Sequence, residues 1–337
     1  MKKAIVLIAA LAAALAWAYA WRGGYLRGDA KIVKRTRFLM DTFCTIQVPN
    51  EAGVAKAEAA INRAFDRMAE VDRKFNCTNP ESPLYKFNYA RVPITDPEVV
   101  GLIERSLELS RETDGAFDIT VQPLVDLWGF YHTSASSRTV PSPASVRRAL
   151  SSVGWKRISV KNGVVTADKD VRLDMGSIAK GYAIGETEKA LKAEGVRSAL
   201  ILAGGQVQVF GSAAPGVPWK VGVRNPRKEG YIAGLSFDSE NGIATAGDYE
   251  RYFEVDGVRY HHIIDPKTGY PAKGGMSVSV ISPDPVLADG LDTPFLVMGQ
   301  KRTFEFLKKH AGVEVIIIDA KGEIVTSRNA PDETKAR

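Results

Sequence analysis

The sequence is poor in cysteine and has no dense block of charge of one sign. Its 337 residues include only Cys44 and Cys77, which excludes a fold held together by several disulfides. The net charge of +6 comes from 45 Lys and Arg against 39 Asp and Glu, and the two signs are interspersed along the chain. No Lys/Arg run and no nucleic-acid-binding motif is present. We therefore expect an ordinary solvated surface and no nucleic-acid partner.

The sequence also lacks an internal repeat and the glycine spacing of a Walker phosphate-binding loop. It does have a hydrophobic content of 45%, enough for one large core or two modest ones in a chain of this length. The chain is therefore expected to be globular.

The first residues have the pattern of a secretory signal. Lys2 and Lys3 precede an uninterrupted run of apolar or small residues at 4–20. The small-x-small triplet at 18–20 fits a cleavage site, whereas the aromatic residues around it equally fit an anchor at a membrane interface. Residues 1–30 are thus a signal peptide or an N-terminal membrane anchor, and both alternatives predict that the remainder is exported.

Beyond the leader, hydrophobic periodicity predicts strands and helices in mixed order, without a regular βαβ repeat. Helices are expected at residues 51–75, 97–114, 146–150, 178–194, 287–298 and 301–310. Strands are expected at residues 37–48, 157–160, 164–167, 199–210, 219–224, 232–237, 252–255, 276–281 and 314–319. This order predicts an α+β fold of mixed, largely antiparallel sheets packed with helices. A single compact catalytic domain at 31–328 is expected, followed by a polar tail at 329–337.

The segment LDMGSIAKGYA is predicted to be a strand end that turns through Gly176 and Ser177 into a helix. A helix opening carries unpaired N–H groups and a partial positive charge, so it can bind phosphate, and Lys180 can add a full charge. The alternative is a plain Ser N-cap followed by a surface lysine.

The segment ADGLDT near the start of a later helix offers hard oxygen ligands. Asp289 and Thr293 are four residues apart and share one helical face, a spacing that suits Mg²⁺. The alternative is that Asp289 or Asp292 only caps the helix.

The segment HHIIDPKTGYP begins with two histidines in a predicted strand. Neighbouring strand residues point to opposite faces, so His261 and His262 make a poor metal pair. One of them suits a general base with an unperturbed imidazole, and the alternative is a histidine that only packs.

The segment TDGAFDITV, followed by LWGF, combines a turn with aromatic residues. It could form a pocket for a flat ring, or it could be a helix stop that leads into the core.

Together these blocks resemble the FAD:protein FMN transferases, the ApbE-type flavin transferases, from about residue 37 to about residue 312. The motifs that carry the resemblance, in the family's order, are LMDT, TDGAFD with PLVDLWGF, LDMGSIAKGYA, AGG, IATAGDYERYF, HHIIDPKTGYP and ADGLDT. The chain departs from the family at Thr78, where an aromatic residue is usual, and at Pro83, where an acidic one is. Gln206 stands where the family often has Asp or Asn, which weakens any polar role assigned to this position.

The resemblance implies transfer of FMN from FAD to a threonine or serine hydroxyl of a partner flavoprotein, with release of AMP and dependence on Mg²⁺. His262 is the expected general base. The expected FAD-binding residues are Met40, Thr78, Ala116, Phe117, Asp118, Asp174, Lys180 and Ile263. The expected metal ligands are Ser177 through its main-chain oxygen, Asp289, Asp292 and Thr293.

The resemblance also implies acceptors among the flavoprotein subunits of membrane redox complexes, on the periplasmic side of a bacterial inner membrane. Two alternatives stay open. One is a periplasmic FAD-binding protein that transfers nothing. The other is an FAD pyrophosphatase, in which water replaces the protein hydroxyl and FMN and AMP are released.

Overall fold

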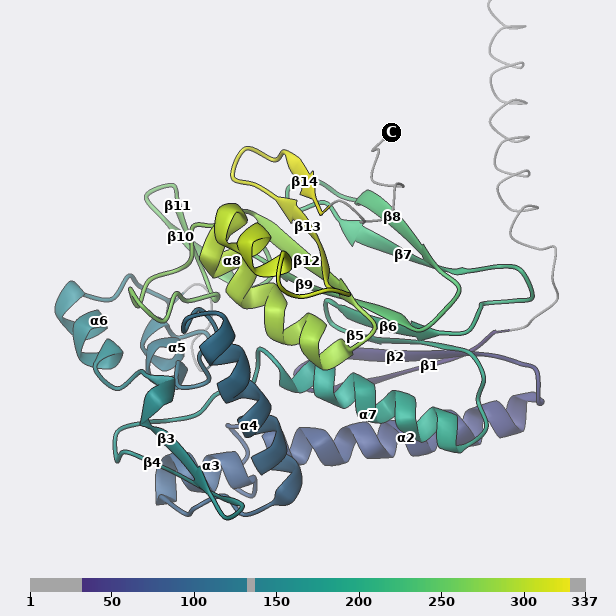
Figure 1. Ribbon diagram of the computed structural model, residues 1–337, viewed down its shortest axis with the longest axis horizontal. Coiled ribbons are helices and arrows are strands. Elements are labelled where there is room, and N and C mark those ends of the chain that lie inside the picture. Colours follow the sequence, from purple (N-terminus) through teal and green to yellow (C-terminus); the bar gives the residue numbers. More distant parts are fainter. Residues whose placement is uncertain (1–31, 132–136, 328–337) are drawn as a thin grey trace, which may run out of the picture.

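The computed structural model describes residues 32–131 and 137–327 (Figure 1). Within them the chain forms seven α-helices and an eight-stranded antiparallel sheet, which confirms the predicted α+β class. The predicted leader at 1–30 and tail at 329–337 lie outside the described residues. Within the described ranges, no helix has the length and apolar character needed to cross a membrane.

The main sheet has the strand order β1-β2-β5-β6-β9-β12-β13-β14. Its strands are β1 (Ile32–Leu39), β2 (Thr42–Pro49), β5 (Ala199–Ala203), β6 (Gln206–Phe210), β9 (Asn241–Gly247), β12 (Ser277–Ser282), β13 (Glu314–Ile318) and β14 (Ile324–Thr326). The remaining strands form three antiparallel pairs: β3 (Ile158–Lys161) with β4 (Val164–Ala167), β7 (Trp219–Arg224) with β8 (Tyr231–Phe237), and β10 (Tyr252–Val255) with β11 (Val258–His261).

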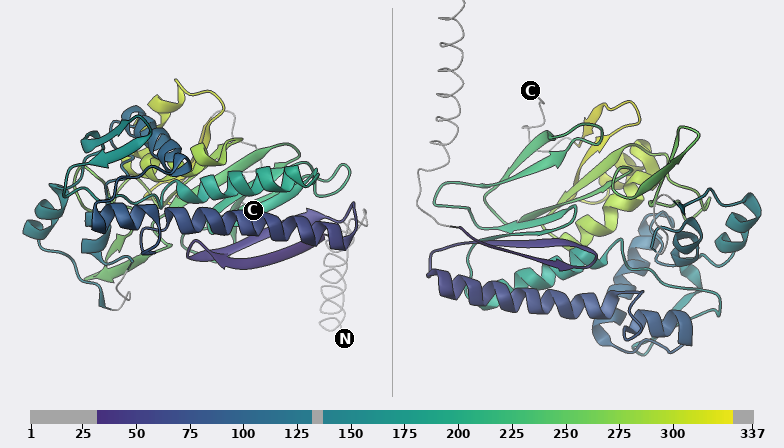
Figure 2. Two further views of the ribbon diagram at one scale, coloured as in Figure 1. Left: turned by 90° about the horizontal axis from the view of Figure 1, so that it is seen from below. Right: turned by 180° about the vertical axis from the view of Figure 1, so that it is seen from behind.

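The main sheet is buried on both faces, because successive side chains of a strand point to opposite sides. Along β5, Ala199, Ile201 and Ala203 belong to one hydrophobic core, whereas Leu200 and Leu202 belong to another. The first core is covered by three helices, α2 (Val54–Phe75), α7 (Ala179–Ala193) and α8 (Pro285–Leu307). The second core is covered by the β7–β8 hairpin. Figures 1 and 2 show α2 and α7 running side by side along the sheet.

Several helices begin where the sequence supplies a capping side chain. The carboxylate of Asp96 accepts hydrogen bonds at the start of α4 (Pro97–Glu112), and Asp284 does the same for α8. Helix α8 changes direction at Gly299, whose φ of 72° is not helical, so it consists of two pieces that match the two predicted helices. The other helices are α3 (Pro83–Ala90), α5 (Gln122–Trp128) and α6 (Pro143–Leu150).

Three expectations about local structure were wrong. The single strand predicted at 37–48 is a hairpin that turns at Met40 and Asp41, whose φ angles are 54° and 57°. Such a two-residue turn usually contains Gly or Asn, so Met-Asp gave no turn signal. The strand predicted at 199–210 likewise turns at 204–205, and no strand forms directly before Gly176.

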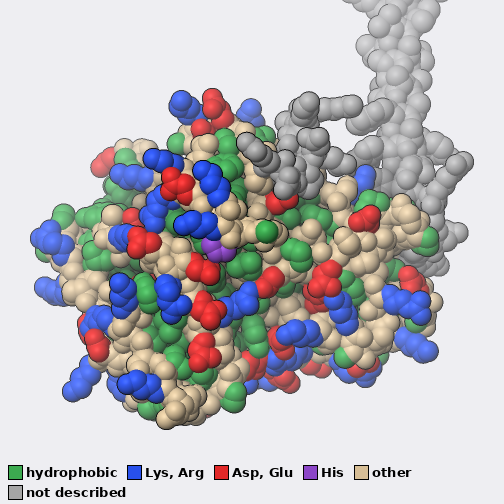
Figure 3. All heavy atoms as spheres, viewed as in Figure 1, with side chains coloured by type: hydrophobic (Ala, Val, Ile, Leu, Met, Phe, Trp, Pro, Cys, Tyr) green, Lys and Arg blue, Asp and Glu red, His purple; other side chains and the backbone are tan. Residues whose placement is uncertain are grey.

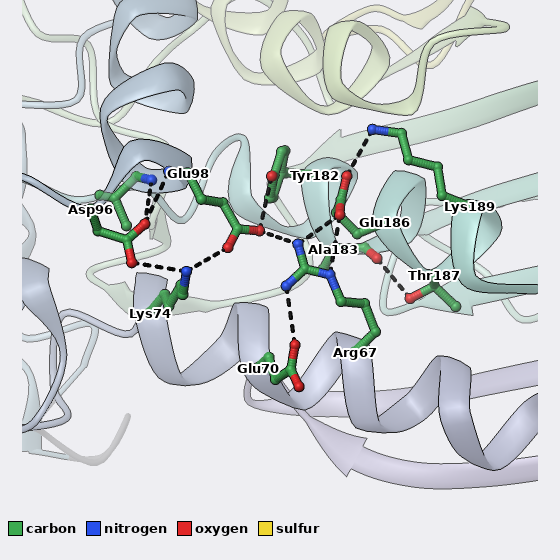
Figure 4. A network of polar contacts seen from close by, with 11 residues as sticks. Arg67, Glu70, Lys74, Asp96, Glu98, Tyr182, Ala183, Glu186, Thr187 and Lys189 are labelled. Carbon is green, nitrogen blue, oxygen red and sulfur yellow. Dashed lines mark hydrogen bonds and ion pairs between the residues drawn. The ribbon is translucent and has the colours of Figure 1, made fainter. Parts of the chain in front are cut away.

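An ion-pair network joins α2, α4 and α7 (Figure 4). The guanidinium of Arg67 lies between Glu98 and Glu186, and Nζ of Lys74 lies 2.7 Å from Glu98. The hydroxyl of Tyr182 donates a 2.9 Å hydrogen bond to the same Glu98. These contacts fix the first turns of α7 against α2 and α4. On the face shown in Figure 3, basic and acidic side chains are interspersed, as the sequence predicted.

Candidate active site

One cavity of about 390 Å³ collects the segments that the sequence singled out. The β1–β2 turn, the β5–β6 turn, the start of α7 and the early turns of α8 all contribute to its wall. Every residue predicted to act on FAD or metal lines it: Met40, Thr78, Ala116, Phe117, Asp118, Asp174, Ser177, Lys180, His262, Ile263, Asp289, Asp292 and Thr293. The structure therefore brings the predicted residues together, although it does not test their individual roles.

The start of α7 is capped from another helix. Its N-cap residue is Ile178, which makes no side-chain cap bond, so the simple Ser cap considered for Ser177 does not form. Instead the backbone N–H of Gly181 donates a 2.7 Å hydrogen bond to Oδ2 of Asp289 in α8. Lys180 folds back over the turn, where its Nζ donates a 2.8 Å hydrogen bond to the carbonyl of Gly176. The helix terminus and the lysine together make this wall of the cavity electropositive.

Two buried carboxylates face this electropositive wall. Asp289 and Asp292 are 1% and 2% exposed. Burial, followed by the negative charge of Asp289, raises the pKa of Asp292 well above its ordinary value. Burial also raises the pKa of Asp289, against the opposing charge of Lys180. A divalent cation would relieve the repulsion between these carboxylates.

The donor set fits Mg²⁺ better than a softer metal. No group of three or more His, Cys, Asp or Glu side chains able to hold a metal occurs in the described part of the chain. The cavity wall offers instead two carboxylates together with Ser177 and Thr293. Mg²⁺ binds through one or two carboxylates, keeps several waters and takes further oxygens from substrate phosphate. These oxygen donors therefore fit the predicted metal.

The two histidines occupy different environments, although β11 ends at His261 and His262 lies just beyond the strand in which both were predicted. His261 is 5% exposed, does not line the cavity, and its Nε2 lies 2.9 Å from the carbonyl of Ala272. His262 lines the cavity, and its Nδ1 lies 3.3 Å from the carbonyl of Arg251. With Nδ1–H as donor to that carbonyl, Nε2 is left as a proton acceptor.

The expectation of an unperturbed imidazole was wrong. Burial, then the positive charges of Arg251, His261 and Lys180, lower the pKa of His262 from 6.5 to about 3. The ring is therefore neutral at physiological pH, which is the form that a general base requires.

Two other predicted carboxylates are used within the protein. Asp174 accepts 2.8 Å hydrogen bonds from the N–H of Gly176 and from the hydroxyl of Tyr131. Asp118 accepts hydrogen bonds from Thr120 and, at 3.0 Å, from the N–H of Trp155. Both side chains line the cavity, but their contacts fix the shapes of the loops around it.

The segment TDGAFDITV with the following LWGF contributes both to a pocket and to the core, the two alternatives that the sequence left open. Phe117 and Phe130 line the cavity, as a pocket for a flat ring requires. Trp128 does not line it, is 1% exposed, and donates a 2.9 Å hydrogen bond to the carbonyl of Gly269. The segment therefore serves both the cavity and the core behind it.

Thr78 lies at the cavity and is exposed, with its hydroxyl 2.7 Å from Oδ1 of Asn76.

Sequence reasoning missed two polar residues of the cavity. Gln206 received no role, yet its Nε2 donates a 2.7 Å hydrogen bond to Oδ1 of Asp289. Arg251 was quoted only within a motif, yet its charge acts on His262. Both roles depend on contacts between distant segments, for which the local sequence carries no signal.

Comparisons with known proteins agree with the resemblance. The model of the ApbE family matches residues 40–317. The FAD:protein FMN transferase of Salmonella typhimurium is 33% identical over 254 residues, which are 72% of each chain. The FAD:protein FMN transferase of Treponema pallidum is 28% identical over 92% of this chain and 90% of the relative.

Solved structures of similar proteins have the same fold. The ApbE protein from Thermotoga maritima has a TM-score of 0.80 and 34% identity, over 88% of this chain and 97% of that one. The flavin transferase ApbE from Vibrio cholerae has a TM-score of 0.78 and 26% identity, over 89% and 98% of the two chains.

Proposed function

The chain belongs to the ApbE family, and we propose that it is an FAD:protein FMN transferase that moves FMN from FAD to a threonine or serine hydroxyl of a partner flavoprotein. One observation carries the proposal. A single cavity holds a lysine at a helix terminus, two buried carboxylates and a neutral histidine, in a chain similar to proteins that bear this activity. Phosphoryl transfer requires these parts: positioning, charge neutralisation and a proton acceptor.

The N-terminal end of α7 binds the anionic part of the substrate. Lys180 and the turn at Gly176 line the cavity and offer positive charge to the diphosphate of FAD. The aromatic side chains of Phe117 and Phe130 line the same cavity and offer apolar surface to the flavin ring.

Asp289, Asp292, Thr293 and the main-chain oxygen of Ser177 are the residues that would hold Mg²⁺. When bound, Mg²⁺ supplies positive charge that makes the diphosphate easier to attack. The two buried carboxylates favour a bound cation, because burial and the negative charge of Asp289 raise the pKa of Asp292.

His262 is proposed to accept the proton. The acceptor hydroxyl attacks the phosphorus of the FMN half, so a new P–O bond forms to the protein. The P–O bond to AMP breaks, and AMP leaves with the electron pair. The hydroxyl proton passes to Nε2 of His262, whose ring is oriented by the contact of Nδ1 with the main-chain carbonyl of Arg251. An anionic diphosphate in the cavity offsets the charges of Arg251 and Lys180, so the pKa of His262 rises when FAD binds.

We place this reaction on the periplasmic side of a bacterial inner membrane, with flavoprotein subunits of membrane redox complexes as acceptors. The signal-like run at 4–20 and the family resemblance support this location.

Product analysis separates the proposal from its two alternatives. Purified protein is incubated with FAD and MgCl₂, with and without a candidate acceptor flavoprotein, and nucleotides are separated by chromatography. A transferase releases AMP only when the acceptor is present. AMP and free FMN without acceptor would identify a pyrophosphatase, and unchanged FAD in both samples would leave only an FAD-binding protein.

A further inference from the structure

We infer that Gln206 is a positioning residue that holds the carboxylate of Asp289 in the orientation needed for Mg²⁺. This inference rests on the proposed function, because it takes Asp289 as a metal ligand. Gln206 does not act on the substrate. It acts through Asp289, and its effect is on the affinity for the metal.

Hydrogen bonds hold the carboxylate of Asp289 from both sides. Nε2 of Gln206 donates to Oδ1 at 2.7 Å, and the backbone N–H of Gly181 donates to Oδ2 at 2.7 Å. Two donors on different oxygens fix the plane of the carboxylate. A carboxylate offers about four lone pairs, so these two bonds do not use its whole capacity and leave room for a metal ion.

The amide of Gln206 can point only one way. A carboxylate that binds a metal ion is ionised and accepts but never donates, so the NH₂ group of Gln206 must then face Asp289, as it does in the structure. The amide oxygen Oε1 then points elsewhere, where it is buried with no hydrogen-bond partner among the described residues. A buried acceptor without a partner opposes stability. The buried Oε1 of Gln206 thus lowers stability, while Nε2 keeps its hydrogen bond to Asp289.

The backbone around Gln206 is rigid. Gln206 is the first residue of β6, an inner strand of the main sheet, and it pairs with Ala244 of β9. It directly follows the tight turn at Gly204, whose φ is 61°. Because its backbone is fixed in the sheet, Gln206 can hold the carboxylate of Asp289 in one orientation.

A neutral donor suits this position electrostatically. Asp289 and Asp292 are both buried, and the negative charge of Asp289 already raises the pKa of Asp292. A glutamate at position 206 would add a third negative charge to this group. Glutamine gives the same reach and a hydrogen bond without that charge. Loss of such an outer-shell partner typically lowers metal affinity about 10- to 100-fold.

Gln208 provides a matched control within the same strand. It lies two residues further along β6, so its side chain points to the same face. It is completely buried, its Oε1 also lacks a hydrogen-bond partner among the described residues, and its Nε2 lies 3.2 Å from the carbonyl of Pro283. It shares the burial of Gln206 but makes no hydrogen bond to Asp289.

The test is a MgCl₂ titration of FAD-free protein followed by thermal unfolding, for wild type, Gln206→Met, Gln206→Glu and Gln208→Met. We expect the Mg²⁺ concentration at half-maximal stabilisation to rise about 10- to 100-fold in Gln206→Met and to stay at the wild-type value in Gln208→Met. Gln206→Glu should unfold at a lower temperature than wild type without metal and recover when Mg²⁺ is added. It keeps the volume of the side chain, so it carries the test if Gln206→Met does not fold.

A purely structural role predicts lower unfolding temperatures for both methionine variants and an unchanged Mg²⁺ midpoint. That result, in a wild type that responds to Mg²⁺, would overturn the role of Gln206 alone. A wild type whose unfolding temperature does not respond to Mg²⁺ would overturn the metal site of the proposed function, and this inference with it.

Discussion

Gly181 of α7 and Asp289 of α8 are in contact, with the backbone N–H of Gly181 donating a 2.7 Å hydrogen bond to Oδ2 of Asp289. Only a glycine allows this approach. A Cβ on Gly181 would lie 2.6 Å from Cβ of Asp289 and 2.2 Å from the carbonyl oxygen of Pro285. The two helices thereby bring the anion-binding terminus of α7 and the carboxylates of α8 to one side of the cavity.

Gly181→Ala should therefore push α7 and α8 apart. Overpacking of this kind costs about 1–3 kcal/mol, and we expect a lower free energy of unfolding together with a large loss of transfer activity. The matched control is Gly185→Ala in the same helix, where a Cβ would meet only Cγ of Pro285, at 3.4 Å. Alanine is the better helix former by about 1 kcal/mol, so Gly185→Ala should be neutral or stabilising in urea unfolding. Equal stability of the two variants would contradict the close contact.

The two histidines should respond differently to substitution. His262→Ala should still bind FAD, because the other proposed contacts remain, but transfer should fall about 100-fold or more, as when a general base is lost. His261→Ala removes a buried ring outside the cavity, so it should lower the unfolding temperature and leave transfer near the wild-type rate. Steady-state rates at saturating FAD, Mg²⁺ and acceptor measure this, and a wild-type rate for His262→Ala would reject the base.

The pH dependence should reflect the low pKa of His262. A pKa of about 3 keeps the ring neutral in the free enzyme, so kcat/KM for FAD should show no acid limb from His262 between pH 8 and pH 5. Arg251→Met removes one of the charges that lower this pKa, so the acid limb should move to higher pH. A wild-type acid limb near pH 6.5 attributable to His262 would show that the ring is unperturbed.

The lowered pKa of His262 should also make the free energy of unfolding depend on pH. The folded pKa of His262 lies below its ordinary value of 6.5, so between about pH 6.5 and pH 3 the unfolded chain binds a proton that the folded chain does not. The contribution of His262 to stability is therefore fully present above pH 6.5 and is lost as the pH falls. NMR titration of the imidazole signals in wild type measures the pKa directly, and the signal that is missing in His262→Ala identifies the His262 ring.

Asp292→Asn should separate stability from activity. Burial and the charge of Asp289 raise the pKa of Asp292, so its ionised form opposes folding at every pH above its unfolded pKa of about 3.9. In metal-free buffer the variant should be more stable than wild type at pH 8, with a difference that shrinks as the pH falls toward the unfolded pKa of about 3.9, while Mg²⁺-dependent transfer falls. Thermal unfolding across this range measures the difference, and a variant less stable than wild type at pH 8 would contradict the repulsion.

Much of the architecture follows from local patterns. Apolar residues spaced by three and four define α2, and the capping aspartate and early proline mark the start of α4. The hairpin turn at Met40 and Asp41 could not be predicted, because methionine is not typical of positive φ and Asp41 stands at the second turn position, where glycine is usual. Both residues line the cavity, and Met40 also packs against the main core, so this unusual turn shapes the site.

The candidate site was predictable where a motif carries it within a few residues, as with Lys180, His262 and Asp289. It was not predictable where the role arises between segments. Gln206 gains its role from a helix more than eighty residues away in the sequence, and Arg251 acts on His262 from the neighbouring loop. The shift in the pKa of His262 likewise depends on the folded surroundings and not on the residue type.

The proposed compartment depends on the apolar run at 4–20. Replacement of this run by polar residues should keep the protein in the cytosol, whereas the unchanged chain should be recovered with the periplasmic or inner-membrane fraction. Cell fractionation of the two forms measures this. Export of the altered chain would contradict the signal.

Intact-mass analysis of a co-expressed acceptor measures the transfer of FMN to a protein hydroxyl. The acceptor is a flavoprotein subunit of a membrane redox complex, expressed with wild-type enzyme or with His262→Ala. We expect a mass increase of one FMN, joined through a phosphoester at a threonine or serine, with wild type and a much smaller modified fraction with the variant. An acceptor that keeps its unmodified mass with folded, FAD-bound wild-type enzyme would contradict transfer, and equal modification by His262→Ala would contradict the role of His262.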